Sequence, residues 1–245
     1  MTVEGPGCAA PVGFFDSGVG GVCILDAFKA ECPAESTVYI ADSANCPYGG
    51  KPLGEVLRLS RANAARLRTE WGCKMVVVAC NTATAAAIDE LRRESPGFPY
   101  VGIEPAVKPA ALNSKTGVVG VLATEGTFNG RLYRETKEKF AKDVTVIATV
   151  ADEFVEMVER GETSGEAAEE KVRRRIEPLI ASGCDSIVLG CTHFPHLKHL
   201  IEKAAAGRAA VVDPSKAVAR RAKAVLEARG LLAPEGAKPT HVFVR

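Results

Sequence analysis

Two cysteines, Cys80 and Cys191, occupy equivalent places in two stretches of similar sequence. Residues 72–82 read GCKMVVVACNT and residues 183–193 read GCDSIVLGCTH, and the two align without a gap. Each is an apolar run of buried-strand length that ends at a small residue, followed by Cys and a side chain that forms hydrogen bonds. Open parallel sheets bind their ligands at the carboxyl ends of the strands. We therefore expect the two thiols to face one small substrate.

A thiolate and a thiol on opposite faces of a carbon atom form a base and acid pair. Such a pair removes a proton from one face and returns it to the other, which inverts the carbon. Asn81, Thr82, Thr192 and His193 supply hydrogen bonds beside the cysteines. A thiol beside the amino end of a helix has a pKa below its reference value of about 8.5, so a lowered pKa is predicted here. No lysine follows either strand to form a Schiff base, which favours chemistry without a cofactor.

A single cysteine after a strand is more often a small packing residue than a catalyst. The duplication favours the catalytic interpretation, because drift within a packed core would be expected to vary the two copies.

A glycine-rich turn follows the first expected strand, residues 11–15. It begins with Asp16 and Ser17 and continues as GVGG over residues 18–21. Glycines permit a tight turn and close approach of a ligand, and the helix that follows offers unpaired N–H groups, so the turn is predicted to bind an anion. Its spacing is not that of a dinucleotide-binding motif. The loop PYGG at residues 47–50 is ordinary turn chemistry, but it too follows a strand.

The remaining pattern alternates strands with helices. Besides the two cysteine strands, strands are expected at 11–15, 37–41, 100–103, 116–122, 144–148, 209–212 and, as an edge strand, 240–244. Helices are expected at 22–29, 53–71, from 82 onward, 152–159, 165–181 and 216–229, with a crossover at 104–109. Such alternation predicts an α/β fold with parallel sheets, with helices on their faces.

The second half of the chain repeats the plan of the first at offsets of about 107 to 111 positions. We therefore predict two similar α/β lobes related by internal duplication, with the active site between them. The first lobe is expected to span 1–103, with 213–245 returning to it, and the second 104–212.

Composition excludes several classes of function. The 245 residues are 47% apolar with a net charge of +1, which allows a sizeable core and gives no basic surface for nucleic acid. Residues 1–8 lack an apolar leader and no later run is long enough to span a membrane, so a cytoplasmic protein without membrane contact is expected. Eight cysteines without a secretion signal indicate reduced thiols. Cys191, His193, His196 and His199 lack structural-zinc spacing, so no metal site is predicted, and the last two are expected to be solvated.

Five motifs in register carry a resemblance to a known family. They are FDSGVGG at 15–21, PYG at 47–49, ACNTA at 79–83, EPA at 104–106 and GCTHFP at 190–195. Together they cover nearly the whole chain, which resembles the glutamate racemases within the aspartate/glutamate racemase superfamily. The resemblance implies interconversion of L- and D-glutamate without a cofactor, to supply D-glutamate for peptidoglycan.

The resemblance also implies roles for individual residues. Cys80 would act on the D-isomer and Cys191 on the L-isomer, with Asp16 and His193 assisting the nearer thiol and Glu159 as a further acidic helper. Thr124 lies in the loop that takes the place of the glycine turn in the second half. The residues expected to bind the substrate are Asp16, Ser17, Tyr48, Gly49, Asn81, Thr82, Thr124, Thr192 and His193.

Three alternatives remain open. Aspartate racemisation uses the same chemistry on a side chain one methylene shorter, and a methylene is worth only about 1–3 kcal/mol of discrimination. Some members of the resembled family also restrain DNA gyrase, so a gyrase-binding regulatory protein is a non-enzymatic alternative. A thiol hydrolase would need only one of the two cysteines.

The resemblance also bears on oligomeric state. Members of the family are often dimers, so a homodimer is possible.

Overall fold

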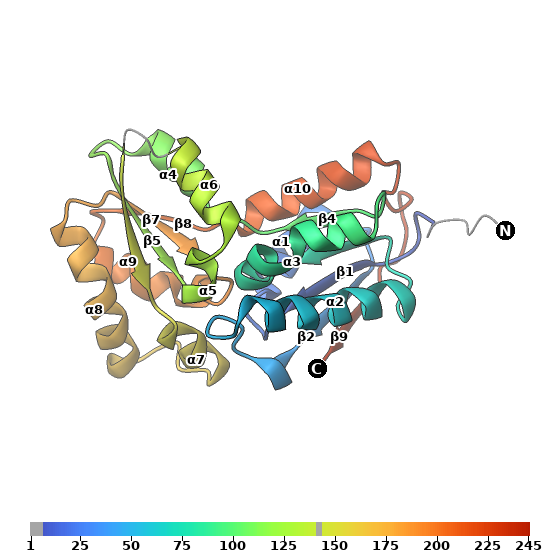
Figure 1. The fold of residues 1–245 in the computed structure, drawn as a ribbon, viewed down its shortest axis with the longest axis horizontal. Coiled ribbons are helices and arrows are strands. Elements are labelled where there is room, and N and C mark those ends of the chain that lie inside the picture. Colours follow the sequence, from blue (N-terminus) through green and yellow to red (C-terminus); the bar gives the residue numbers. More distant parts are fainter. Residues whose placement is uncertain (1–6, 141–143) are drawn as a thin grey trace.

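The computed structural model describes residues 7–140 and 144–245, and these form two parallel β-sheets that lie side by side in two lobes (Figure 1). Residues 1–6, part of the segment judged to lack a leader, lie outside the described residues. Among the described residues the first sheet has the strand order β4-β3-β1-β2-β9 and the second the order β6-β5-β7-β8. The first consists of β1 (Val12–Asp16), β2 (Thr37–Ala41), β3 (Met75–Val78), β4 (Tyr100–Gly102) and β9 (His241–Val244). The second consists of β5 (Val118–Ala123), β6 (Thr145–Val150), β7 (Ser186–Gly190) and β8 (Ala210–Val212).

Helices cover both faces of each sheet, as a parallel sheet requires. The first sheet lies between α1 (Val22–Glu31) with α10 (Ser215–Ala228) and α2 (Leu53–Thr69) with α3 (Asn81–Glu94). One face of the second sheet is covered by α4 (Val107–Asn113) and α6 (Arg131–Phe140). The other face is covered by α7 (Glu153–Glu159), α8 (Glu166–Ala181) and α9 (Lys198–Ala205). The shorter elements are η1 (Ser43–Asn45), α5 (Glu125–Phe128) and η2 (Phe194–Leu197).

Successive side chains of a strand point to opposite faces of a sheet, and helices cover both faces here, so both sets of side chains on the apolar strands are buried. On β1, Phe14 packs towards α1 and α10, whereas Phe15 packs towards α2 and α3. On β3, Val77 and Val78 divide between the same two faces. This two-sided burial explains why the strands read as continuous apolar runs in the sequence.

The internal duplication predicted from the sequence is confirmed in the sheets. The order β4-β3-β1-β2 of the first lobe corresponds to β8-β7-β5-β6 of the second. Gly13 of β1 pairs with Val76 of β3, and the equivalent Gly120 of β5 pairs with Ile187 of β7. The two-lobed parallel α/β fold is therefore as predicted.

Some elements differ from the predicted pattern. Helix α4 begins at Val107, inside the segment expected to be a plain crossover.

The end of the chain lies with the first sheet, because helix α10 packs on α1 and β9 pairs with β2. We accordingly propose 1–103 with 213–245 and 104–212 as the two lobes. Within the described residues, no helix has both the length and the apolar character needed to cross a bilayer.

Glycines at equivalent strand positions provide a test of the duplication. A Cβ atom on Gly13 would lie 3.0 Å from both the Cys73 sulfur and a Leu67 methyl carbon. A Cβ atom on Gly120 would lie 3.1 Å from the Cys184 sulfur and 3.0 Å from Leu179. All four neighbouring side chains are buried and have little room to move.

We predict that Gly13→Ala and Gly120→Ala each lower the free energy of unfolding by about 1–3 kcal/mol through overpacking, as measured by urea unfolding. Gly54→Ala is the matched control, because its added methyl group meets nothing within 4 Å on an exposed turn of α2. That change is expected to be neutral or stabilising, since alanine favours helix. Equal stability of all three variants would contradict the packing described here.

Candidate active site

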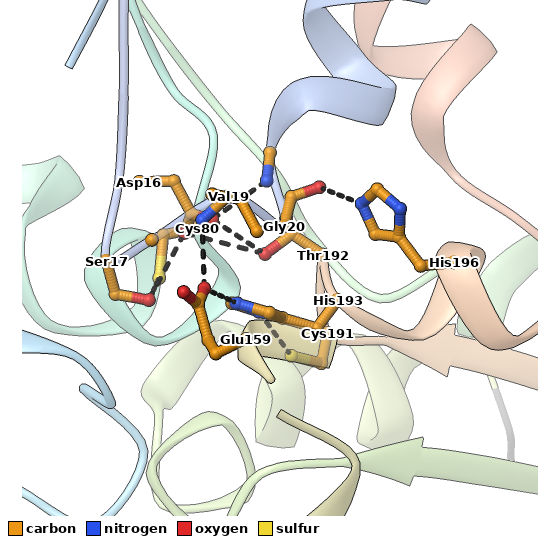
Figure 2. Close-up of polar contacts among 12 residues, drawn as sticks. Asp16, Ser17, Val19, Gly20, Cys80, Glu159, Cys191, Thr192, His193 and His196 are labelled. Atoms are coloured by element: carbon orange, nitrogen blue, oxygen red, sulfur yellow. Dashed lines mark hydrogen bonds and ion pairs between the residues drawn. The ribbon is translucent and has the colours of Figure 1, made fainter. Parts of the chain in front are cut away.

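The carboxyl ends of β1, β3 and β7 bring Asp16, Cys80 and Cys191 into one site where the lobes meet (Figure 2). The three residues are 0%, 4% and 7% exposed. Figure 2 shows both cysteines in the same site, with Asp16, Glu159 and His193 around them. The structure thus brings together the two cysteines that the sequence singled out, one from each lobe.

The thiol of Cys80 caps the amino end of α3. Its sulfur accepts a hydrogen bond from the Ala83 N–H at 3.5 Å and lies 3.9 Å from the Ser17 hydroxyl oxygen. Burial, followed by the negative charge of Asp16, raises the pKa of Cys80 well above its ordinary value. The lowered pKa predicted from the helix amino end is therefore wrong for Cys80, because one long backbone hydrogen bond does not offset burial beside a carboxylate.

Cys191 has different surroundings, because a turn and the short helix η2 follow it. Its sulfur lies 3.8 Å from Nδ1 of His193, whose Nε2 lies 2.6 Å from a carboxylate oxygen of Glu159. Burial alone would lower the pKa of His193, but hydrogen bonds to Cys191, Cys46 and Glu159 raise it well above its ordinary value. The hydrogen bond to His193 in turn lowers the pKa of Glu159. The pair is thus an imidazolium and a carboxylate beside the thiol.

The glycine turn of the first lobe holds this ion pair. A Cβ atom on Gly18 would lie 2.0 Å from a Glu159 carboxylate oxygen, and one on Gly20 would lie 2.5 Å from Nδ1 of His193. The Val19 N–H donates to the same Glu159 oxygen at 2.9 Å. The turn predicted to bind an anion therefore holds a carboxylate of the protein itself, supplied by the other lobe.

Asp16 forms a second polar contact between the lobes. Its carboxylate accepts hydrogen bonds from the Gly21 N–H at 2.8 Å and from the Thr192 hydroxyl at 3.3 Å. Burial raises its pKa, although the nearby charge of His193 opposes that rise. Asp16 is thus adjacent to Cys80 and is joined to the residue that follows Cys191.

Asn81 is distinguished from the other residues expected to bind the substrate by a side-chain amide that is buried and unpaired. Both its amide nitrogen and its amide oxygen are buried without a hydrogen-bond partner among the described residues. An unpaired buried amide is costly, so its atoms are available for a polar ligand. Next to it, the hydroxyl oxygens of Thr82, Thr124 and Thr127 lie 3.0 to 3.5 Å from one another across the two lobes. Thr127 was not singled out from the sequence.

Tyr48 and Gly49 lie in a loop that is held from both sides. The Tyr48 hydroxyl donates to Asp42 at 2.5 Å, and the Asn63 amide donates to the same carboxylate at 3.1 Å. The Gly49 carbonyl accepts a hydrogen bond from the Gly126 N–H of the second lobe at 3.0 Å. The Tyr48 hydroxyl is therefore engaged within its own lobe, by two residues that sequence reasoning did not identify.

Two residues, His196 and Cys46, make contacts between the lobes that the sequence did not predict. His196 was expected to be solvated, but it is half-buried and its Nε2 lies 3.3 Å from the Gly20 carbonyl oxygen in the other lobe. His199 is exposed, as expected. Cys46 lies beside His193 and contributes to its raised pKa. No signal in the local sequence reveals these contacts, because each partner comes from the opposite lobe.

Comparisons with known proteins agree with this geometry. A family model described as Asp/Glu/Hydantoin racemase matches residues 23–222. A glutamate racemase from Pseudomonas syringae is 42% identical and covers 96% of this chain and 85% of its own length. One from Herpetosiphon aurantiacus is 44% identical, over 92% of this chain and 88% of its own. The crystal structure of glutamate racemase from Francisella tularensis in complex with D-glutamate superposes with a TM-score of 0.83 at 28% identity, covering 96% of this chain and 88% of that one.

The raised pKa of Cys80 predicts its reactivity. A thiol with a raised pKa stays protonated through neutral pH, and only the thiolate reacts with iodoacetamide. We predict that the alkylation rate of Cys80 in the ligand-free protein keeps rising with pH beyond about 8.5, the reference value for a thiol. Peptide mass spectrometry at a series of pH values measures that rate, with the same cysteine in the urea-unfolded chain as control. A rate for the folded protein that levels off at lower pH than in the unfolded chain would contradict the assignment.

Proposed function

The chain belongs to the Asp/Glu/hydantoin racemase family, and we propose that it interconverts L- and D-glutamate with Cys80 and Cys191 as its two proton-transfer groups. The observation that supports this most strongly is the position of the thiols. They come from equivalent strands of the two lobes, β3 and β7, and share one buried site with a carboxylate and an imidazolium. Two bases of the same kind suit a reaction whose substrate and product are mirror images.

The proposed reaction is a proton transfer in two steps. The thiolate of one cysteine removes the proton from the α-carbon, and the electron pair of the broken C–H bond is delocalised into the α-carboxylate. The thiol of the other cysteine then gives its proton to the opposite face of the carbon. Cys80 would act on D-glutamate and Cys191 on L-glutamate. Because the two thiols exchange their protonation states, the reaction consumes no co-reactant and needs no cofactor.

The surrounding polar groups have distinct tasks in this proposal. His193, 3.8 Å from the Cys191 sulfur, exchanges a proton with that thiol, and Glu159 stabilises the imidazolium form. Asp16 lies beside Cys80 and is the carboxylate suited to the substrate ammonium group. The amide of Asn81 and the first N–H groups of α3 are the donors for the negative charge that develops on the α-carboxylate.

Glutamate is the proposed substrate because the relatives that are 42% and 44% identical over most of the chain are glutamate racemases. D-Glutamate would be supplied for peptidoglycan. Aspartate is shorter by one methylene, so discrimination is expected to be modest, on the order of 10- to 200-fold in kcat/KM. Circular dichroism of the amino acid during turnover of each substrate measures this ratio, and equal or greater activity on aspartate would overturn the choice.

Replacement of each thiol tests the mechanism. Cys80→Ala and Cys191→Ala are each expected to lower kcat/KM for racemisation by roughly 10²- to 10⁴-fold, because each removes a general acid or base. The wild-type protein in deuterated water is expected to place deuterium at the α-carbon of the product in both directions, measured by NMR. Cys32→Ala is the control, since this thiol is buried against α1 and α10 away from the site. Full activity of either active-site variant would exclude the two-thiol mechanism.

A further inference from the structure

Three potential metal ligands meet at the edge of the site. A thiol sulfur of Cys46, a carboxylate oxygen of Glu159 and a ring nitrogen of His193 all lie within 4.8 Å of one another. Cys46 follows η1 in the first lobe, whereas Glu159 ends α7 and His193 follows β7 in the second. The cluster therefore exists only when the two lobes are together, and its members are distant in the sequence.

The donor set suits zinc. A thiolate, an imidazole nitrogen and a carboxylate oxygen are the three ligand types that zinc takes in proteins. Tetrahedral zinc with bonds of about 2.0–2.3 Å holds its ligand atoms about 3.3–3.6 Å apart. The Glu159 oxygen and His193 Nε2 are now 2.6 Å apart, and no pair in the cluster exceeds 4.8 Å. Shifts of about 1 Å in side chains would therefore produce the coordination geometry.

The cluster is accessible from outside the protein. A pocket of about 240 Å³ is lined by Cys46 and Glu159 together with Ser43, Pro47, Val155, Glu156 and Arg160. Cys46 is half-buried and the Glu159 side chain is 23% exposed, whereas His193 forms the buried end of the cluster. An ion entering by this pocket would meet Cys46 and Glu159 first, with His193 behind them, and the three ligands would leave a fourth position for water.

Groups around the cluster already orient the ligands. The Val19 N–H donates to the Glu159 carboxylate, and the other ring nitrogen of His193 faces the sulfur of Cys191 (Figure 2). Such outer contacts fix the direction of metal ligands in known sites. Magnesium and calcium prefer sites made of oxygen atoms alone, so the thiol and imidazole favour zinc.

We propose that Cys46, Glu159 and His193 form an inhibitory zinc site. Zinc binding releases the proton of the Cys46 thiol and the proton of the His193 ring nitrogen that takes the ion, and it engages the two groups that assist Cys191. An ion here would also tie the first lobe to the second across the site. Zinc binding rests on the three ligands alone, whereas inhibition rests in addition on the proposed racemase function.

Equilibrium binding tests the site without reference to activity. The whole protein, reduced and freed of metal, is titrated with Zn²⁺ against a chromogenic chelator, and Co²⁺ is used as a spectroscopic probe for sulfur ligation. One ion per chain and a sulfur-to-cobalt charge-transfer band are expected. Cys46→Ala is expected to weaken zinc binding by at least about 10-fold and to abolish the band. Cys8→Ala, which removes another half-buried thiol, is the matched control and is expected to change neither.

The racemisation assay on the same preparations separates the two proposals. Each variant is compared with its own rate in the absence of metal. Wild type and Cys8→Ala are expected to lose activity as Zn²⁺ saturates the site, whereas Cys46→Ala is expected to keep its own metal-free rate at that concentration. Absence of zinc binding, or binding unchanged in Cys46→Ala, would overturn the site. Loss of binding only in Cys80→Ala or Cys191→Ala would assign the ion to the catalytic thiols instead and would also overturn the Cys46 site.

Two further outcomes separate the inhibitory role from the proposed function. Zinc binding without inhibition would refute the inhibitory role. A metal-free protein without racemase activity would refute the proposed function while leaving the binding result intact.

Discussion

The carboxylate of Glu159, packed against the glycine turn of the opposite lobe, is the contact on which the rest of the site depends. It accepts hydrogen bonds from the Val19 N–H and from His193, and no side chain larger than glycine would leave room for it at position 18. This contact holds the imidazolium form of His193 beside the Cys191 sulfur. One interaction thus joins the lobes, fills an otherwise empty turn and sets the charge next to a thiol.

The two halves share a framework but differ where the chemistry lies. In both, a strand glycine packs on a cysteine sulfur, Gly13 on Cys73 and Gly120 on Cys184. Beyond the carboxyl ends of the strands, the surroundings of the two catalytic-site cysteines differ. Cys80 caps a long helix, whereas Cys191 precedes a turn and is paired with a histidine. A duplicated framework therefore supplies two thiols in equivalent positions and gives each a different acid–base partner.

The predictable part of the fold is the part encoded locally. Apolar runs identify the strands, and their duplication predicts the matching strand order, because each run carries its own periodicity. The same alignment singles out Cys80 and Cys191. Contacts such as His196 with the Gly20 carbonyl, or Cys46 with His193, join segments far apart in the chain. They depend on how the lobes meet, which no local pattern encodes, and for the same reason helix position alone gave the wrong direction for the pKa of Cys80.

The raised pKa of Cys80 is consistent with a catalytic base once the substrate charge is considered. In the ligand-free site, burial and the negative charge of Asp16 both disfavour a thiolate at this position. An amino-acid ammonium group bound to Asp16 would neutralise that carboxylate and remove the repulsion, so the pKa of Cys80 would fall as substrate binds. The reactive thiolate would then form only when a substrate occupies the site. The same burial that makes Cys80 unreactive alone would protect it from oxidation and other electrophiles between turnovers, because these attack the thiolate.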